Sequence, residues 1–248
     1  MAGVRIIYDS TCTGTADITC TWTVPAGTCR VTFEIWGGGG GGGNKGTNCD
    51  CCSRGQGGSG GGYSKKTVDT TPGCQYTIVV GKAGTSSQGY GSFCGICCDG
   101  CAGGTTYISG FGLSNFCATG GGGGKSDFNN NCYAHCGCNY YSVTPGCGYG
   151  GDVVAKGFTP TITRYGDNNP YNIIVKGGGA AGPGGGAGGY NGFGGYNNNS
   201  GYCAVIGEHN FHGRIPGGGG AGSGGHSGCD CTPYPSGRGA PGMVKITF

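Results

Sequence analysis

The sequence predicts an all-β fold with much irregular structure, in which short antiparallel strands frame stacked, extended segments of the polyglycine-II type. Three observations lead there. Glycine supplies 66 of the 248 residues, mostly in long runs. Residues that favour helix interiors are nearly absent, since the only leucine is Leu113 and the only glutamates are Glu34 and Glu208. Short runs of alternating polarity, typical of strands, flank the glycine runs. We therefore expect essentially no α-helix.

The longest glycine tract runs from Gly177 to Tyr202, and shorter tracts cover Gly37 to Gly43, Gly120 to Gly124 and Gly217 to Gly225. Glycine loses more backbone freedom on folding than any other residue, so such a tract is ordered only if its own amide groups find partners. Threefold extended helices allow this, because neighbours without side chains approach closely and pair laterally. A row of glycines three residues apart fits such a helix: Gly179, Gly182, Gly185 and Gly188. An irregular loop is the alternative. Collagen is excluded, since only 10 residues are proline.

The strands alternate in polarity. Residues 29–36 predict a half-buried strand, with Val31, Phe33 and Ile35 inward and Arg30, Thr32 and Glu34 outward. Residues 63–70 and 75–80 predict a hairpin joined across Pro72-Gly73. The other predicted strands are residues 4–8, 17–24, 105–108, 116–119, 152–156, 172–175 and 243–248.

Each strand is too short to be stable alone, so we expect a single glycine-rich domain over residues 1–248. Its β framework would come from residues 1–36, 63–81, 105–119, 152–176 and 243–248. Its glycine-rich layers would come from residues 37–62, 120–151 and 177–242.

Nineteen cysteines predict a fold that is stapled by disulfides, because the apolar residues are few for this length. The disulfide candidates are Cys12, Cys20, Cys29, Cys49, Cys51, Cys52, Cys74, Cys117, Cys147, Cys203, Cys229 and Cys231. The alternative for two dense clusters is a zinc or iron site, since C-x-x-C spacings suit tetrahedral metals. Its ligands would be drawn from Cys94, Cys97, Cys98, Cys101, Cys132, His135, Cys136 and Cys138. Otherwise no cofactor is expected.

Several function classes are disfavoured. The segment TGGGGGKS, Thr119 to Ser126, resembles a phosphate-binding loop, but it lacks the first glycine and no helix pattern follows. No catalytic motif accompanies the four histidines, so we expect no enzyme and no catalytic residues. A net charge of +3 without a run of basic residues argues against a nucleic-acid-binding protein. No apolar run could span a membrane, and the first ten residues do not resemble a signal peptide.

Recognition is the better-supported role. Aromatic and asparagine residues gather in segments between the predicted strands, and such residues suit glycans or outer-surface proteins. The alternative is that these rings cap the glycine helices, and the sequence does not decide between the two. The candidate binding residues are Tyr140, Tyr141, Tyr190, Phe193, Tyr196, Asn197, Asn198, Asn199, His209, Phe211 and His212.

Four segments occur in a characteristic order: VPAGTCRVTFEIWGGGGGGG, TPGCQYTIVVGKAGTSSQGYGSF, ATGGGGG and GAPGMVKITF. Together they resemble the glycine-rich domain of bacteriophage tail fibres and tail-tip adhesins, in which glycine tracts pack as extended left-handed helices. The resemblance covers most of the chain, although insertions rich in cysteine, asparagine and tyrosine interrupt it.

The resemblance implies a virion structural protein, a tail-fibre or fibre-tip component that attaches the phage to its host. It would assemble in the host cytoplasm and become exposed on the virion. Its partners would be other virion proteins and a host-surface glycan or protein. A homotrimer is expected for a fibre part, and a monomer for some tips. The alternatives are a capsid-decorating or neck-fibre protein and a non-phage coat or antifreeze-like protein.

Overall fold

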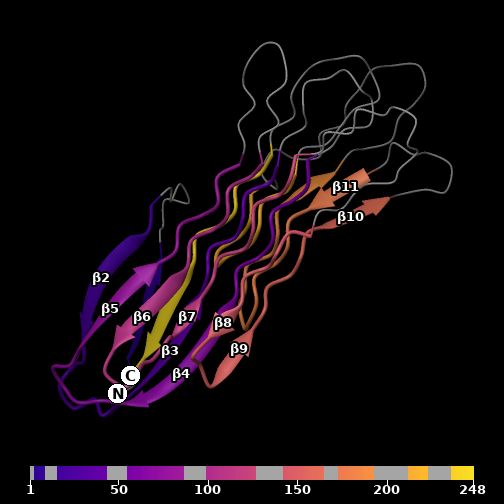
Figure 1. Cartoon of the computed structure of the whole chain (residues 1–248). Coiled ribbons are helices and arrows are strands. Elements are labelled where there is room, and N and C mark those ends of the chain that lie inside the picture. Colours follow the sequence, from indigo (N-terminus) through magenta and orange to yellow (C-terminus); the bar gives the residue numbers. More distant parts are fainter. Residues whose placement is uncertain are drawn as a thin grey trace, which may run out of the picture.

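The computed structural model describes residues 3–8, 16–43, 55–86, 99–126, 142–164, 173–192, 212–222 and 236–248. Over these residues the chain is built of strands and extended segments without any α-helix, as the sequence predicts. The strands of two sheets gather at one end, where the two chain ends also lie, and the glycine segments run in parallel toward the other, where β10 (Thr161–Arg164) and β11 (Ile173–Lys176) lie (Figure 1). None of the described residues forms a helix of the length and apolarity that crossing a membrane requires.

Two five-stranded antiparallel sheets form the strand end. The first sheet has the order β1 (Val4–Tyr8), β13 (Met243–Thr247), β3 (Arg30–Trp36), β4 (Tyr63–Asp69) and β9 (Val153–Ala155). The second has the order β2 (Ile18–Thr23), β5 (Gln75–Val80), β6 (Thr106–Gly110), β7 (Cys117–Ala118) and β8 (Gly148–Tyr149).

The two sheets enclose one apolar core. Val31, Phe33 and Ile35 of β3 are fully buried in it, which confirms their predicted inward face. Trp22 and Tyr76 reach the core from the second sheet, and the Phe33 ring lies 6.0 Å and 4.9 Å from theirs, centroid to centroid. Each such fully buried large side chain contributes about 1.5–3 kcal/mol. The strand end is therefore held together by ordinary side-chain packing.

The predicted hairpin of residues 63–80 is wrong. Both of its strands exist, but β4 pairs with β3 and β9 in the first sheet, whereas β5 pairs with β2 and β6 in the second. The Pro72-Gly73 turn instead carries the chain from one sheet to the other. The physical reason is the core, since Val68 and Tyr76 face it from opposite sheets.

Glu34 faces outward from the core, as predicted, but is only 8% exposed. It lies on the outer face of the first sheet, where its Oε1 accepts a hydrogen bond of 2.8 Å from the Tyr63 hydroxyl. Its Oε2 lies 3.0 Å from Lys245 Nζ. Burial acts to raise the pKa of Glu34, but the hydrogen bonds from Lys245 and Tyr63 and the nearby lysine charges bring it below its ordinary value.

Beyond the strands the sheets continue as glycine segments. Residues 37–43 form a central column in which every residue donates its amide proton laterally, with a period of three. Gly37, Gly40 and Gly43 donate to the segment 55–62, at N···O distances of 2.9–3.0 Å. The intervening glycines donate alternately to the segments 99–104 and 236–240. Such a threefold alternation of donor directions is that of polyglycine-II helices.

The carbonyl groups of the same column point to three further neighbours. Gly38 and Gly41 accept from the segment 118–126, Gly39 accepts from Gly84, and Gly40 accepts from Gly220. The column 37–43 is thus surrounded by six other segments. The column 55–62 is surrounded in the same way, by residues 37–43, 118–126, 142–146, 156–158, 177–181 and 217–222. We call this set of extended segments the glycine bundle.

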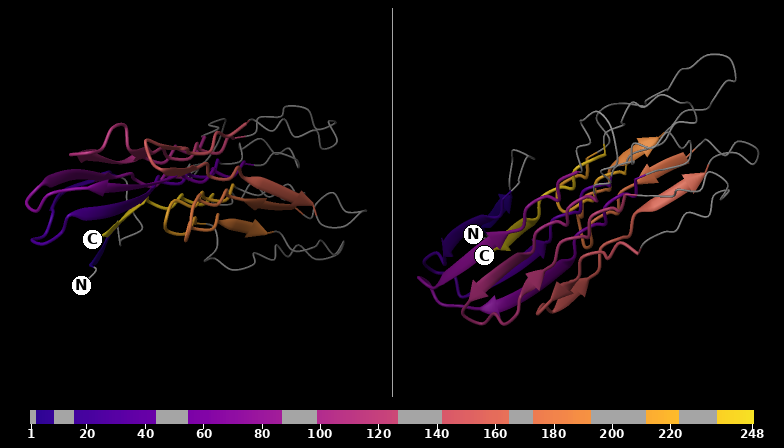
Figure 2. Two further views of the ribbon diagram at one scale, coloured as in Figure 1. Left: turned by 90° about the horizontal axis from the view of Figure 1, so that it is seen from below. Right: turned by 45° about the horizontal axis from the view of Figure 1, so that its top comes forward.

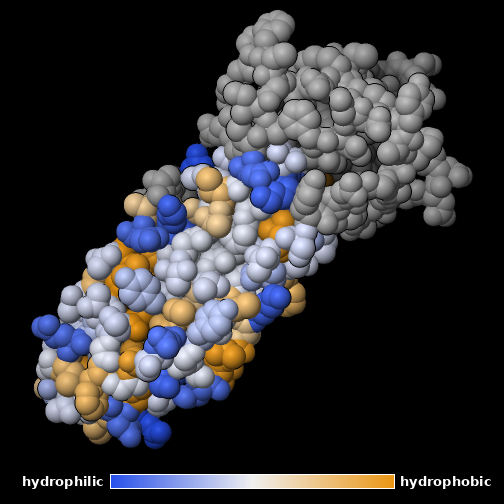
Figure 3. All heavy atoms as spheres, viewed as in Figure 1, coloured by the Kyte–Doolittle hydropathy of each residue, from blue (hydrophilic) through white to orange (hydrophobic). Residues whose placement is uncertain are grey.

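The glycine bundle has three layers, which Figure 2 shows from the side. Two of them extend the two sheets. The third, from residues 177–189 and 212–222, covers only the bundle and meets the first sheet where Ala180 and Ala181 contact Trp36 and Tyr63. The surface over the bundle is pale in Figure 3, whereas orange apolar patches are most frequent over the strand end.

The expected row from Gly179 to Gly188 is wrong as a single helix. The chain reverses at residues 182–184, where Gly182 and Gly184 have φ angles of 77° and 70°, and returns as a second segment. Positive φ there requires glycine, and Pro183 fits the turn. A separate three-stranded sheet of β10 (Thr161–Arg164), β11 (Ile173–Lys176) and β12 (Tyr190–Gly192) lies at the end of the bundle remote from the other two sheets (Figure 1). The sequence indicated only β11 of these three.

The predicted disulfide staples are not supported. Six cysteines lie among the described residues, and each is free: Cys20, Cys29, Cys74, Cys101, Cys117 and Cys147. The other thirteen lie outside the described residues. Among the described residues, the lateral hydrogen bonds of the glycine bundle tie together segments that are far apart in sequence.

Candidate recognition end of the glycine bundle

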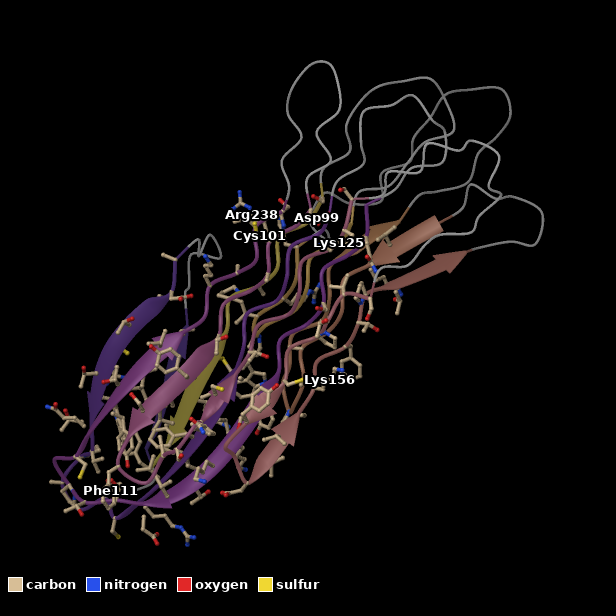
Figure 4. The ribbon with its side chains drawn as sticks, in the orientation of Figure 1. Asp99, Cys101, Phe111, Lys125, Lys156 and Arg238 are labelled. Carbon is tan, nitrogen blue, oxygen red and sulfur yellow. The ribbon has the colours of Figure 1, made fainter. Side chains whose placement is uncertain are left out.

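We call the two five-stranded sheets and their shared core the sandwich. Several described segments end at the opposite end of the bundle. Amide hydrogen bonds of 2.8–3.0 Å join Gly43 to Gln56, Gln56 to Lys125, Cys101 to Thr85 and Gly42 to Gly237. We call this group, together with Asp99 and Ser126, the distal end. In Figure 4 the labelled residues Asp99, Cys101, Lys125 and Arg238 lie together there, far from Phe111 at the sandwich end. Chain positions far apart in sequence therefore meet at one end of a rigid support.

Asp99 organises one side of the distal end. Its Oδ2 accepts a 2.6 Å charged hydrogen bond from Lys125 Nζ, and its Oδ1 accepts from the Ser126 amide at 2.9 Å and the Ser126 hydroxyl at 3.2 Å. Burial acts to raise the pKa of Asp99, but these hydrogen bonds and the Lys125 charge bring it below its ordinary value. Because all three side chains are occupied with each other, the cluster fixes the ends of two segments.

The same contacts show why TGGGGGKS does not act as a phosphate-binding loop. Its glycines lie inside the bundle, where the amides of Gly121, Gly122 and Gly124 donate to Gly38, Thr144 and Gly41. Lys125 pairs with Asp99. The amide groups that would hold a phosphate are therefore already used.

Two of the predicted binding residues lie among the described ones. His212 Nδ1 accepts a 3.0 Å hydrogen bond from the Arg238 amide. Burial, and secondly the Arg238 charge, lowers the pKa of His212, so the ring is neutral near pH 7 and one nitrogen is occupied. Tyr190 begins β12, with its backbone paired to Lys176. His212 thus has a structural partner, which no local pattern in the sequence indicates.

The other predicted binding residues lie outside the described residues, in stretches whose described flanks are at this end of the molecule: Tyr140, Tyr141, Phe193, Tyr196, Asn197, Asn198, Asn199, His209 and Phe211. Seven of the eight candidate metal ligands also lie outside: Cys94, Cys97, Cys98, Cys132, His135, Cys136 and Cys138. The eighth, Cys101, is free and exposed. Within the described ranges no three His, Cys, Asp or Glu side chains come together as a metal site.

The sequence did not point to the Asp99 cluster, because Asp99 and Lys125 are 26 positions apart and no spacing rule links them. Only the lateral order of the glycine segments brings them together.

Comparison with known proteins supports the resemblance to a glycine-rich domain. No curated protein matches the chain. The family described as the glycine-rich domain matches residues 12–248, almost the whole chain. The protein is therefore a member of the glycine-rich domain family.

Proposed function

We propose that this protein is a structural component of a bacteriophage virion, a tail-fibre or fibre-tip part that attaches the particle to its host. The observation that carries the proposal is the polarity of the molecule. The two five-stranded sheets and both described chain ends lie at one pole, and the distal end, where described glycine segments from distant parts of the chain meet, lies at the other (Figure 1).

The glycine bundle suits such a role physically. A binding surface made of chain segments keeps its shape only if the scaffold beneath is rigid. The columns 37–43 and 55–62 are each fixed by lateral hydrogen bonds to six neighbouring segments. A substitution in a segment that begins and ends on this support would leave the hydrogen bonds of the bundle in place, which suits a surface that must follow a changing receptor.

The candidate binding residues named above supply the chemistry, since tyrosine, phenylalanine and asparagine contact glycans and proteins at low entropic cost. The other partners would be neighbouring virion proteins, with a homotrimer or a single tip subunit as the assembly. A capsid-decorating or neck-fibre protein remains the second candidate, because the same rigid bundle would serve there too.

The test uses the purified protein and a panel of bacteria. Fluorescently labelled protein should bind the host strain and reduce infection by the cognate phage when added first. A variant with Tyr140, Tyr141, Tyr196 and Phe211 replaced by serine should keep the thermal stability of the parent and lose both effects. A protein that binds no strain and leaves infection unchanged would be a decoration or coat protein instead.

A further inference from the structure

The strands of the second sheet differ in charge from those of the first sheet. Strands β2, β5, β6, β7 and β8 contain no charged residue. The five strands of the first sheet contain Arg5, Arg30, Glu34, Lys65, Lys66, Asp69 and Lys245. Solvent-exposed sheet faces normally carry charges. An exposed face without them therefore calls for an explanation beyond solubility.

This face presents two kinds of group in register. Tyr107 pairs with Cys117 and Cys117 pairs with Tyr149, so the two tyrosines stand on one row with a small side chain between them. They are 42% and 50% exposed. On the next row Thr21 pairs with Thr77 and Thr77 with Ser109, which gives a line of hydroxyl groups across three strands.

The spacing of the tyrosines is set by the sheet. They stand two strands apart, and neighbouring strands are separated by about 4.8 Å, so the rings are about 9.6 Å apart along the row. That distance is on the scale of two sugar units in an extended β-linked chain. Cys117 lies between them without protruding, and burial raises the pKa of its thiol, so it remains uncharged.

We infer that the outer face of the second sheet binds an extended, uncharged, β-linked polysaccharide. A pyranose ring has an apolar face of C–H groups that stacks on an aromatic ring. Alternate sugar rings of the chain stack on Tyr107 and Tyr149, and the hydroxyls of Thr77 and Ser109 bond to sugar hydroxyls at its side. The chain runs across the strands. A charged glycan is disfavoured, because the five strands of this sheet carry no charged residue that would pair with it.

This surface is distinct from the distal end and independent of the proposed role in host attachment. Ice is the competing occupant, since a regular array of threonine hydroxyls also suits an ice lattice. The geometry favours a sugar chain. Tyr107 stands beside Ser109 at the end of the hydroxyl row, and Tyr149 stands two strands further along. A twisted sheet also does not present the flat plane that ice requires.

The experiment measures binding of the full chain to cellohexaose and chitohexaose by calorimetry, with polygalacturonate as the charged comparison. We expect one or both neutral oligosaccharides to bind and polygalacturonate not to bind. Tyr107→Ala and Tyr149→Ala should each weaken binding by about tenfold and the double variant by about a hundredfold, since the sites are far enough apart to act additively. Tyr107→Phe should retain binding, because the ring remains.

Phe158→Ala is the matched control, since Phe158 is a 64% exposed aromatic residue outside this face. It should bind like the parent, and all variants should melt at the parent temperature. The inference is overturned if neither neutral oligosaccharide binds, or if the double tyrosine variant binds as tightly as the parent. It is also overturned if the protein lowers the freezing point of water and Thr21→Val with Thr77→Val abolishes that effect, which would assign the face to ice.

Discussion

The sandwich and the glycine bundle are two halves of one molecule that are stabilised in opposite ways. In the sandwich, side chains such as Phe33, Trp22 and Tyr76 fill the space between two sheets, and backbone pairing runs only within each sheet. In the bundle there are almost no side chains to fill space, and backbone pairing runs between layers as well as within them. At Trp36, where β3 ends and the column 37–43 begins, the chain passes from the sandwich into the bundle.

The comparison shows that glycine in the bundle is required for close approach of neighbouring backbones. At every position from Gly37 to Gly43, an added Cβ would lie less than 3.0 Å from a backbone atom of a neighbouring segment. The neighbours would have to move apart, and their lateral hydrogen bonds would break. In the sandwich, truncating a side chain leaves a cavity, whereas in the bundle adding one carbon removes a contact.

The largest effect should come from the sandwich. Phe33 is fully buried and contacts rings from the opposite sheet. We expect Phe33→Ala to lower the free energy of unfolding by about 3–5 kcal/mol, through lost burial and the remaining cavity. Chemical denaturation followed by circular dichroism measures this. Phe33→Leu, which keeps most of the volume, should cost markedly less; equal losses for both variants would show that the core is loosely packed.

In the bundle, adding a side chain should destabilise the protein, whereas in the sandwich removing one does. Gly40 donates to Ser59 at 2.9 Å and accepts from Gly220 at 2.8 Å, and its added Cβ would meet the Gly122 carbonyl. Gly40→Ala should therefore cost about 3 kcal/mol, from overpacking and lost hydrogen bonds. Ordinary linker glycines gain stability from the same substitution. An unchanged midpoint of denaturation for Gly40→Ala would contradict close packing.

A matched pair in the third layer sharpens this point. An added Cβ on Gly178 would meet the Phe158 carbonyl, whereas on Gly179 the nearest atom, Gly186 O, is 3.5 Å away. Gly178→Ala should destabilise the protein by about 1–3 kcal/mol, and Gly179→Ala should be neutral or stabilising by about 0.5 kcal/mol. Thermal melts of the two single variants, side by side, test it. A reversed order would mean that these segments are not placed as described.

Glu34, near the junction of the sandwich and the bundle, makes a smaller contribution to the free energy of unfolding, and this contribution depends on pH. Glu34 has a pKa below its ordinary value of 4.5, so its stabilisation is complete above that value and is lost as the pH falls through the folded-state pKa. Glu34→Gln should cost about 2 kcal/mol at neutral pH. That difference from the parent should shrink toward zero in acid, and denaturation curves between neutral and acidic pH measure it. A difference that stays constant with pH would assign the cost to packing instead of charge.

The sequence was sufficient for the fold class and for most strands, because alternation in runs such as residues 30–36 reports a half-buried strand directly. Strand pairing was harder. Nothing local in residues 63–80 distinguishes a hairpin from a crossing between sheets, since both need the same Pro72-Gly73 turn. The reversal at Gly182 was hidden for a similar reason, because glycine is compatible with both a turn and an extended helix.

The candidate sites were less predictable. The aromatic and asparagine residues that indicated recognition lie mostly outside the described residues, so they stay predictions. The Asp99 cluster and the uncharged outer face depend on which segments become neighbours. In the second case a signal did exist. Thr19, Thr21 and Thr23 are exposed and alternate with buried or half-buried residues along β2, and charged residues are absent from all five strands of that sheet.

The most direct test of the account is residue-resolved amide hydrogen exchange over residues 37–43, 55–62, 177–189 and 217–222, compared with strands β3 and β5. If lateral backbone pairing holds the bundle, the amides of Gly38, Gly40 and Gly41 will exchange as slowly as those of the buried strands. Exchange at the rate of an unstructured glycine peptide in these segments, with the strands still protected, would contradict it.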